Sequence, residues 1–187
     1  MASPANTNQL TGSIPALTGL ASLRYFLVNN NQLSGQIPSL NGLGALEAFS
    51  AGVNRLTGPL PPLTGQGLNA LQRFRVHYNQ LSGPMPADLT GLNLTAFMVG
   101  NNQLTGNPPT APATLIASDS NLCTNNLSKP YPDSPAWDTA TGSTPWWSAC
   151  AAATAAATPV PALSDWALVL LGCMLAGVAA LRRSRRA

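Results

Sequence analysis

Apolar residues recur along the chain in a fixed order, and the first clear copy runs from Leu23 to Asn31 as Leu-x-x-Phe-x-Val-x-x-Asn. The Phe and Val positions are two residues apart, so both side chains point to the same side of an extended strand. Three more copies begin at Leu46, Leu71 and Leu94. The pattern therefore predicts four short strands, each with one buried face.

Each predicted strand runs into an octet with the order Asn-Gln-Leu-Ser-Gly-Gln-Ile-Pro, complete at residues 31–38. Variants of the octet lie at 8–15, 54–61, 79–86 and 102–109. Successive Asn residues are 23 or 25 positions apart, and a last Asn121 follows 19 residues later. A fixed period in this range indicates stacked repeat units.

The polar and small residues of the octet have structural roles. A buried Asn amide both donates and accepts, so it can satisfy backbone groups where the chain turns out of the strand. Stacked copies would then form a ladder of amides. The glycine permits a bend, and the proline returns the chain across the back without a helix. We therefore expect turns along the octets, with one inward leucine two residues after each Asn.

The Leu-x-x-Phe-x-Val-x-x-Asn-x-Leu pattern resembles the leucine-rich repeat, and the continuation Leu-Ser/Thr-Gly-x-Ile-Pro resembles its plant-specific subclass, which also occurs in bacteria. The resemblance implies a right-handed leucine-rich repeat solenoid with a parallel β-sheet on the concave side and turns or 3-10 segments on the convex side. Ala51 weakens one core position, and Gln66 and Gly67 are a two-residue insertion on the back.

Composition divides the chain into five regions. Residues 1–7 are a small, polar start without a signal peptide or cap, from which we expect a truncated N-terminus. About five repeats occupy 8–122. We expect a cap over 123–150, an Ala/Thr linker over 151–159, and a tail with a membrane-spanning helix over 160–187.

Strand alternation predicts the side chains that project from the concave sheet. The third strand carries two arginines and the chain's one histidine, followed by a tyrosine. Such a cationic patch suits a carboxylate, a phosphate or an acidic saccharide, although a strand open to water needs polar residues in any case. Exposed apolar residues on other strands add a contact area or are scattered surface positions. The candidate ligand-binding residues are Tyr25, Leu27, Arg73, Arg75, His77, Tyr78 and Met98.

Cys123 stands two residues after Asn121, where earlier repeats have Leu, and Cys150 follows a stretch with three tryptophans. This arrangement resembles the C-terminal cap of extracellular leucine-rich repeat proteins. The resemblance implies a Cys123–Cys150 disulfide, and two free cysteines are the alternative.

The tail has three parts. Residues 160–166, with Val160, Pro161, Leu163, Ser164 and Trp166, resemble the IPTL-CTERM sorting motif of Gram-negative bacteria. Residues 166–181 are uncharged and slightly short for a typical hydrocarbon core, but they suffice for a transmembrane helix with Trp166 at the interface and the following arginines reaching to the surface. These arginines predict a cytoplasmic C-terminus. The resemblance implies recognition by a sorting transpeptidase of the exosortase class, whereas a plain membrane anchor is the alternative. The basic residues are Arg182, Arg183, Arg185 and Arg186.

Charge excludes some functions. The formal net charge of +3 comes from the basic tail, because five basic and five acidic residues balance in residues 1–158. The body has no broad basic face for nucleic acid. One His and three Cys show no metal-ligand spacing, no nucleophile elbow is visible, and no cofactor is expected.

The sequence thus predicts a non-enzymatic module on the bacterial cell envelope, membrane-anchored or released at the surface. The module would bind an unknown protein or saccharide ligand through the concave face. The alternatives are a structural envelope or biofilm-matrix component without a defined ligand, and an inhibitor of a secreted polysaccharide-degrading enzyme. The last rests on analogy alone.

Overall fold

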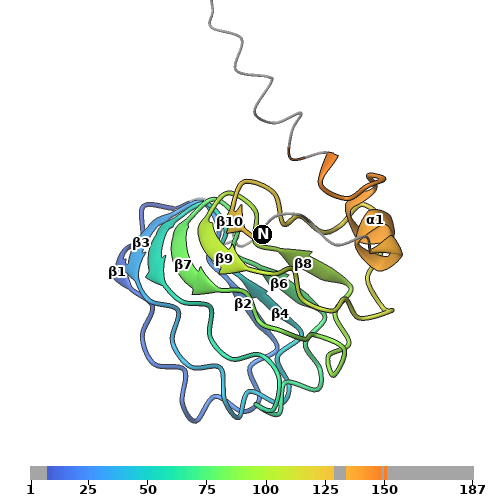
Figure 1. The fold of residues 1–187 in the computed structure, drawn as a ribbon. Coiled ribbons are helices and arrows are strands. Elements are labelled where there is room, and N and C mark those ends of the chain that lie inside the picture. The colour runs from blue at the N-terminus through green and yellow to red at the C-terminus, as the bar shows by residue number, and fades with distance from the viewer. Residues whose placement is uncertain (1–7, 129–133, 149, 151–187) are drawn as a thin grey trace, which may run out of the picture. The chain divides into compact units, whose positions relative to one another are not determined.

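The computed structural model describes residues 8–128, 134–148 and 150. The chain divides into two compact units, 1–153 and 154–187, and all described residues lie in the first. Within that unit the chain coils into stacked turns that supply strands to two parallel sheets (Figure 1).

The first sheet has four parallel strands in the order β2-β4-β6-β8. Their register pairs equivalent residues of successive turns, such as Phe26 with Phe49 and Phe74 with Phe97. The four phenylalanine rings stack at centroid distances of 5.1, 5.6 and 5.9 Å. The strand prediction and its inward face are therefore confirmed. The bounds are β2 Tyr25–Leu27, β4 Ala48–Ser50, β6 Arg73–Arg75 and β8 Ala96–Met98.

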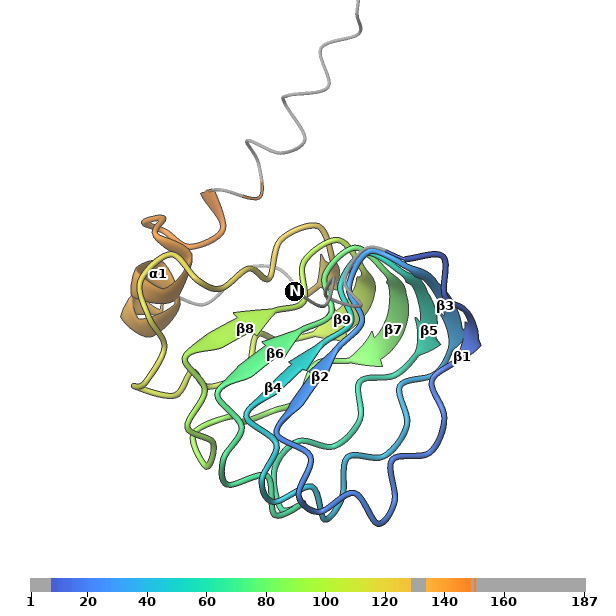
Figure 2. The ribbon, with the colours of Figure 1, turned by 180° about the vertical axis from the view of Figure 1, so that it is seen from behind.

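The second sheet has six parallel strands in the order β1-β3-β5-β7-β9-β10, visible beside the first sheet in Figure 2. These strands lie in the octets, where turns were expected. The turns expected on the back are present between each octet and the next strand, as at 41–42 and 64–65. The near-constant period brings identical octets to the same height, where their backbone groups pair from turn to turn. The bounds are β1 Thr11–Ser13, β3 Gln32–Gly35, β5 Arg55–Gly58, β7 Gln80–Pro84, β9 Gln103–Gly106 and β10 Asn126–Leu127.

Leucines and phenylalanines fill the interior between the two sheets. Leu56, Leu81 and Leu104 from the second sheet are fully buried, as are Phe49 and Phe74 from the first. Each fully buried side chain of this size contributes about 1.5–3 kcal/mol relative to its exposed state. Because each turn repeats the same inward positions, the core is a set of continuous columns along the stack.

The predicted asparagine ladder is present. In Asn79, Oδ1 accepts a hydrogen bond from the backbone N–H of Leu56 in the preceding turn, at 2.9 Å. Its Nδ2 donates to the carbonyls of Ala51 and Val76, at 3.0 and 3.1 Å. Each amide therefore joins two turns and satisfies backbone groups that no strand partner reaches. Acceptor bonds of the same kind are made by Asn31, Asn54, Asn102 and Asn125.

The last member of the ladder is Asn125, so the prediction of Asn121 in this role is wrong. Asn125 Oδ1 accepts from the backbone of Leu104, and β10 continues the second sheet beyond residue 122. Asn121 Oδ1 accepts only from the nearby Cys123 N–H among the bonds described, at 2.7 Å. The pattern was hidden because Ser120 replaces the phenylalanine of this turn, and its Oγ accepts from Phe97 N at 3.1 Å.

A short cap closes the C-terminal end of the repeats. Helix α1 (Pro135–Thr141) begins after the N-cap Ser134 and ends at Gly142, which has a left-handed conformation. Its buried Trp137 lies 6.1 Å from the Phe97 ring and donates from Nε1 to the Pro109 carbonyl at 2.8 Å. The predicted Cys123–Cys150 disulfide is present, with Cα atoms 4.8 Å apart.

Within the described ranges, no helix has the length and apolarity needed to cross a membrane. The predicted transmembrane segment at 166–181, the sorting motif at 160–166 and the arginines at 182–186 all lie outside the described residues.

The ladder predicts that replacing Asn125 by Ala lowers the free energy of unfolding more than replacing Asn121 does. Asn125→Ala removes an acceptor for Leu104 N and a donor to the Val99 and Leu122 carbonyls. Leaving such groups unpaired should lower the free energy of unfolding by about 3 kcal/mol, against about 1 kcal/mol for Asn121→Ala. Urea denaturation of both variants measures this difference. Equal losses would contradict the assigned register.

Candidate binding surface

Large and small outward side chains alternate between the turns of the four-stranded sheet. The strands β2 and β6 carry long side chains, whereas β4 and β8 carry mostly small ones. Ala48 and Ser50 on β4 are buried although they face outward, and in the register each lies between a long residue of β2 and one of β6. The surface is therefore formed mainly by β2 and β6, with a floor of small residues between them.

Arg75 on β6 is paired with Asp119, which strand alternation did not predict on this face. Its Nη2 donates to both carboxylate oxygens of Asp119, at 2.8 and 2.9 Å, and both side chains are about one third exposed. Asp119 stands six residues before Asn125, as Arg73 stands six residues before Asn79. Counting back from the correct ladder residue would have placed it on this face. Arg75 is thus engaged within the sheet.

His77 continues β6 and packs flat against the backbone of the preceding turn. A Cβ at Gly52 would lie only 2.6–3.0 Å from atoms of the His77 ring, so any larger residue there would displace the ring. Burial, and then the charge of Arg75, lower the pKa of His77 below its ordinary value of 6.5. The ring is therefore neutral at pH 7. Its Nδ1 and the Nε of Arg75 are buried without a hydrogen-bond partner among the described residues.

A second polar cluster joins β2 to the next turn. The Tyr25 hydroxyl donates to Glu47 Oε2 at 2.5 Å, and Arg24 donates from Nε to Glu47 Oε1 at 2.8 Å. Hydrogen bonds from Tyr25 and then Arg24 lower the pKa of Glu47, and the charge of nearby Arg73 lowers it further. The Arg24 guanidinium also lies 5.4 Å from the centre of the Tyr25 ring. Neither Arg24 nor Glu47 was predicted as a binding residue, because each directly precedes its strand.

The remaining predicted residues differ in their exposure. Leu27 and Tyr25 are 39% and 49% exposed, and Tyr78 is 57% exposed at the end of the third turn's outward row. Met98 is partly exposed, and its place in an apolar contact area stays a prediction. Arg73 is exposed and lies between Ala48 and Ala96 in the sheet register. The open part of the face is thus formed by Tyr25, Leu27, Arg73 and Tyr78.

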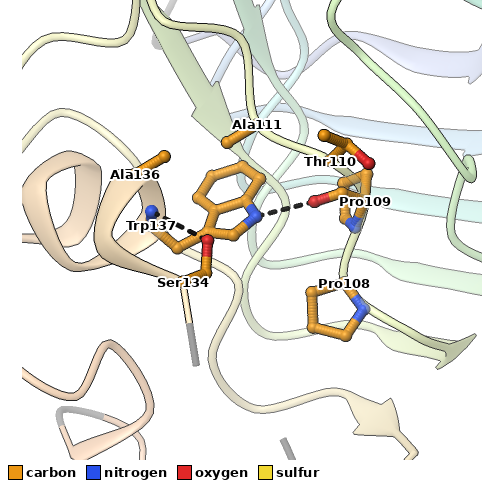
Figure 3. Close-up of a pocket in the computed structure, with 7 residues that line it drawn as sticks. All are labelled: Pro108, Pro109, Thr110, Ala111, Ser134, Ala136 and Trp137. Carbon is orange, nitrogen blue, oxygen red and sulfur yellow. Dashed lines mark hydrogen bonds between the residues drawn. The ribbon is translucent and has the colours of Figure 1, made fainter. Parts of the chain in front are cut away.

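A cavity of about 260 Å³ lies elsewhere, between the end of the repeats and helix α1 (Figure 3). Trp137 forms one wall, and its hydrogen bond to the Pro109 carbonyl fixes that wall. The lining carries no charged group. The residues around it are Pro108, Pro109, Thr110, Ala111, Ser134, Ala136 and Trp137.

No three His, Cys, Asp or Glu side chains in the described residues lie close enough to hold one metal ion. What the surface offers is a set of exposed aromatic, aliphatic and cationic side chains on a rigid sheet.

The described turns form a β-solenoid that resembles the ectodomains of plant leucine-rich repeat receptors. The receptor RGFR1, solved in complex with RGF2, has 31% identity and a TM-score of 0.58 over 64% of this chain. The Arabidopsis receptor kinase HAESA with an IDA peptide hormone has 32% identity and a TM-score of 0.55 over 65%. GASSHO1/SCHENGEN3 from Arabidopsis thaliana, in complex with CASPARIAN STRIP INTEGRITY FACTOR 2, has 36% identity and a TM-score of 0.56 over 64%.

These receptors are much longer, since the chain spans 20%, 21% and 15% of their respective lengths. No curated protein matches the chain by sequence.

Residues 158–186 match the IPTL-CTERM motif. The chain is therefore a leucine-rich repeat-like solenoid with a C-terminal sorting signal, which implies targeting to the cell envelope or surface.

The pKa of His77 gives a direct test of the burial of its ring and of the effect of Arg75. We expect His77 to titrate below pH 6.5 in the folded protein, so the folded chain binds this proton more weakly than the unfolded chain. The free energy of unfolding should then fall as the pH drops through about 6.5 and level off below the folded pKa. Proton NMR of the imidazole measures the pKa, which should rise partway towards 6.5 in Arg75→Gln. Arg55→Gln, on the other sheet, should leave it unchanged, and a wild-type pKa above 6.5 would contradict the assigned burial.

Proposed function

We propose that this protein is a binding module displayed on a bacterial cell envelope, and that it recognises a polypeptide ligand through the outward face of the four-stranded sheet. The observation that carries the proposal is the exposure of Tyr25, Leu27, Arg73 and Tyr78 on one rigid face. Aromatic and arginine side chains are the residues that most often dominate binding interfaces.

The similar plant receptors support a polypeptide ligand, because HAESA was solved with the peptide hormone IDA and RGFR1 is a peptide hormone receptor. The exposed side chains here fit such a ligand in two ways. Tyr25 and Leu27 present apolar area, and Arg73 supplies a positive charge for an acidic side chain or a carboxyl terminus. Arg75 takes no direct part, because Asp119 neutralises it. His77 is uncharged, and its ring packs against Gly52 and Tyr78.

The proposed route to the surface depends on the tail. A sorting transpeptidase of the exosortase class would recognise the motif around Pro161, Leu163 and Trp166. The apolar run at 166–181 would hold the precursor in the membrane, with the arginines on the cytoplasmic side. Removal of that run would leave the solenoid, cap and linker at the envelope.

The binding face can be tested with the full chain displayed on cells. Arg73→Ala and Tyr25→Ala should each weaken binding to the protein fraction of envelope or host extracts by about tenfold or more. Arg55→Ala is the matched control, because Arg55 is exposed on β5 of the other sheet. Loss of binding in the control alone, or unchanged binding in the two face variants, contradicts the proposed face. Unsaturable adhesion that all variants share favours a structural matrix component.

The tail makes a separate prediction. Mass spectrometry of the protein released from the envelope should show that the segment after the sorting motif has been removed. Pro161→Ala combined with Trp166→Ala should leave the precursor uncleaved in the membrane fraction. Retention of residues 166–187 in the wild-type surface protein would instead support a plain anchor.

A further inference from the structure

One backbone position in every described turn has a left-handed conformation. It is the residue immediately before the ladder asparagine, and its φ lies between 52° and 59°. Asn tolerates this region because its short polar side chain bonds locally, whereas a β-branched or bulky residue is strained there. The residues at this position are Asn30, Val53, Tyr78, Asn101 and Thr124.

The asparagine ladder and its flanking bonds impose this conformation on each turn. The N–H of Val53 donates to the His77 carbonyl at 2.8 Å, and the Val53 carbonyl accepts from Asn31 N at 3.1 Å. The same pair of bonds holds Tyr78. The chain itself uses Asn at two equivalent positions, so Val and Tyr are more strained choices than the fold requires.

Packing does not account for these two choices. Val53 is 41% exposed and Tyr78 is 57% exposed, so neither side chain belongs to the core. They occupy the same position in adjacent turns, which places them about 5 Å apart along the stack. The His77 ring meets Tyr78 edge-on, with centroids 5.7 Å apart. The side chains of Val53 and Tyr78, with the His77 ring against Tyr78, form a short apolar ridge where the turns leave the four-stranded sheet.

We propose that the Val53–Tyr78 ridge is a specificity-determining contact that receives an apolar side chain of the polypeptide ligand. This inference rests on the proposed function. It adds that the ligand presents an apolar side chain and that this side chain binds at Val53 and Tyr78. Strained residues that persist without a packing role are typical of binding sites, where the interaction with the ligand compensates for the lost stability.

The chemistry of the ridge favours an apolar side chain over a sugar. The backbone N–H and C=O groups of Val53 are already bonded to neighbouring turns, as are those of Tyr78. No charged residue stands at the equivalent position in any described turn. A saccharide needs several hydrogen-bond partners, whereas a Leu, Ile or Phe side chain needs only exposed apolar surface that can be removed from water.

The test uses opposing effects on stability and binding. Val53→Asn and Tyr78→Asn place the chain's own preferred residue at each position, so each should raise the Tm by about 2–4 °C. A phage-displayed random peptide library selected on the full chain should yield peptides that share an apolar residue. Those peptides should bind the Val53→Asn/Tyr78→Asn double variant at least tenfold more weakly. Thr124→Asn is the matched control, since it should raise the Tm and leave peptide binding unchanged.

The outcomes separate this inference from the proposed function. Selected peptides that lose affinity for Arg73→Ala but not for the double variant would leave the binding face standing and overturn the ridge. Failure to select any peptide would overturn both. A glycan array signal that disappears in the double variant would overturn the apolar polypeptide contact. An unchanged or lower Tm in both asparagine variants would refute the strain on which the inference depends.

Discussion

The amide of one asparagine per turn holds this structure together. Its oxygen accepts from the turn before, and its nitrogen donates to carbonyls of its own turn and the preceding one. Both sheets depend on it, because it satisfies the backbone at the corner between them and keeps successive octets at one height. The phenylalanine and leucine columns then follow, since residues at a fixed distance from the asparagine always face the interior.

The same constraint decides how much the sequence could predict. Four strands, their inward faces, the ladder and the disulfide followed from spacing and from resemblance to known repeats. The second sheet did not, because Gln-Leu-Ser-Gly has the composition of a turn and becomes a strand only when identical copies stack beside it. Local preference was overridden by the repeat itself.

The candidate surface was predictable in its positions but less so in its interactions. Alternation identified Arg73, Arg75 and His77 as outward residues, but not the pairing of Arg75 with Asp119. That error began in the last turn, where Ser120 stands in place of phenylalanine and the ladder residue was misassigned to Asn121. Burial of His77 on Gly52 depends on a contact between turns that no single-strand pattern contains.

The insertion at Gln66 and Gly67 shows what kind of length change the fold accepts. The turn that carries it has 25 residues instead of 23, yet Asn54 and Asn79 keep their ladder bonds. The inserted Gly67 has a positive φ, and the insertion lies in a turn away from both sheets. Evolution can therefore lengthen loops on the back one codon at a time, whereas the sheets grow only by duplication of whole turns. The length of the sheets therefore changes in whole turns, whereas the length of the loops on the back changes by single residues.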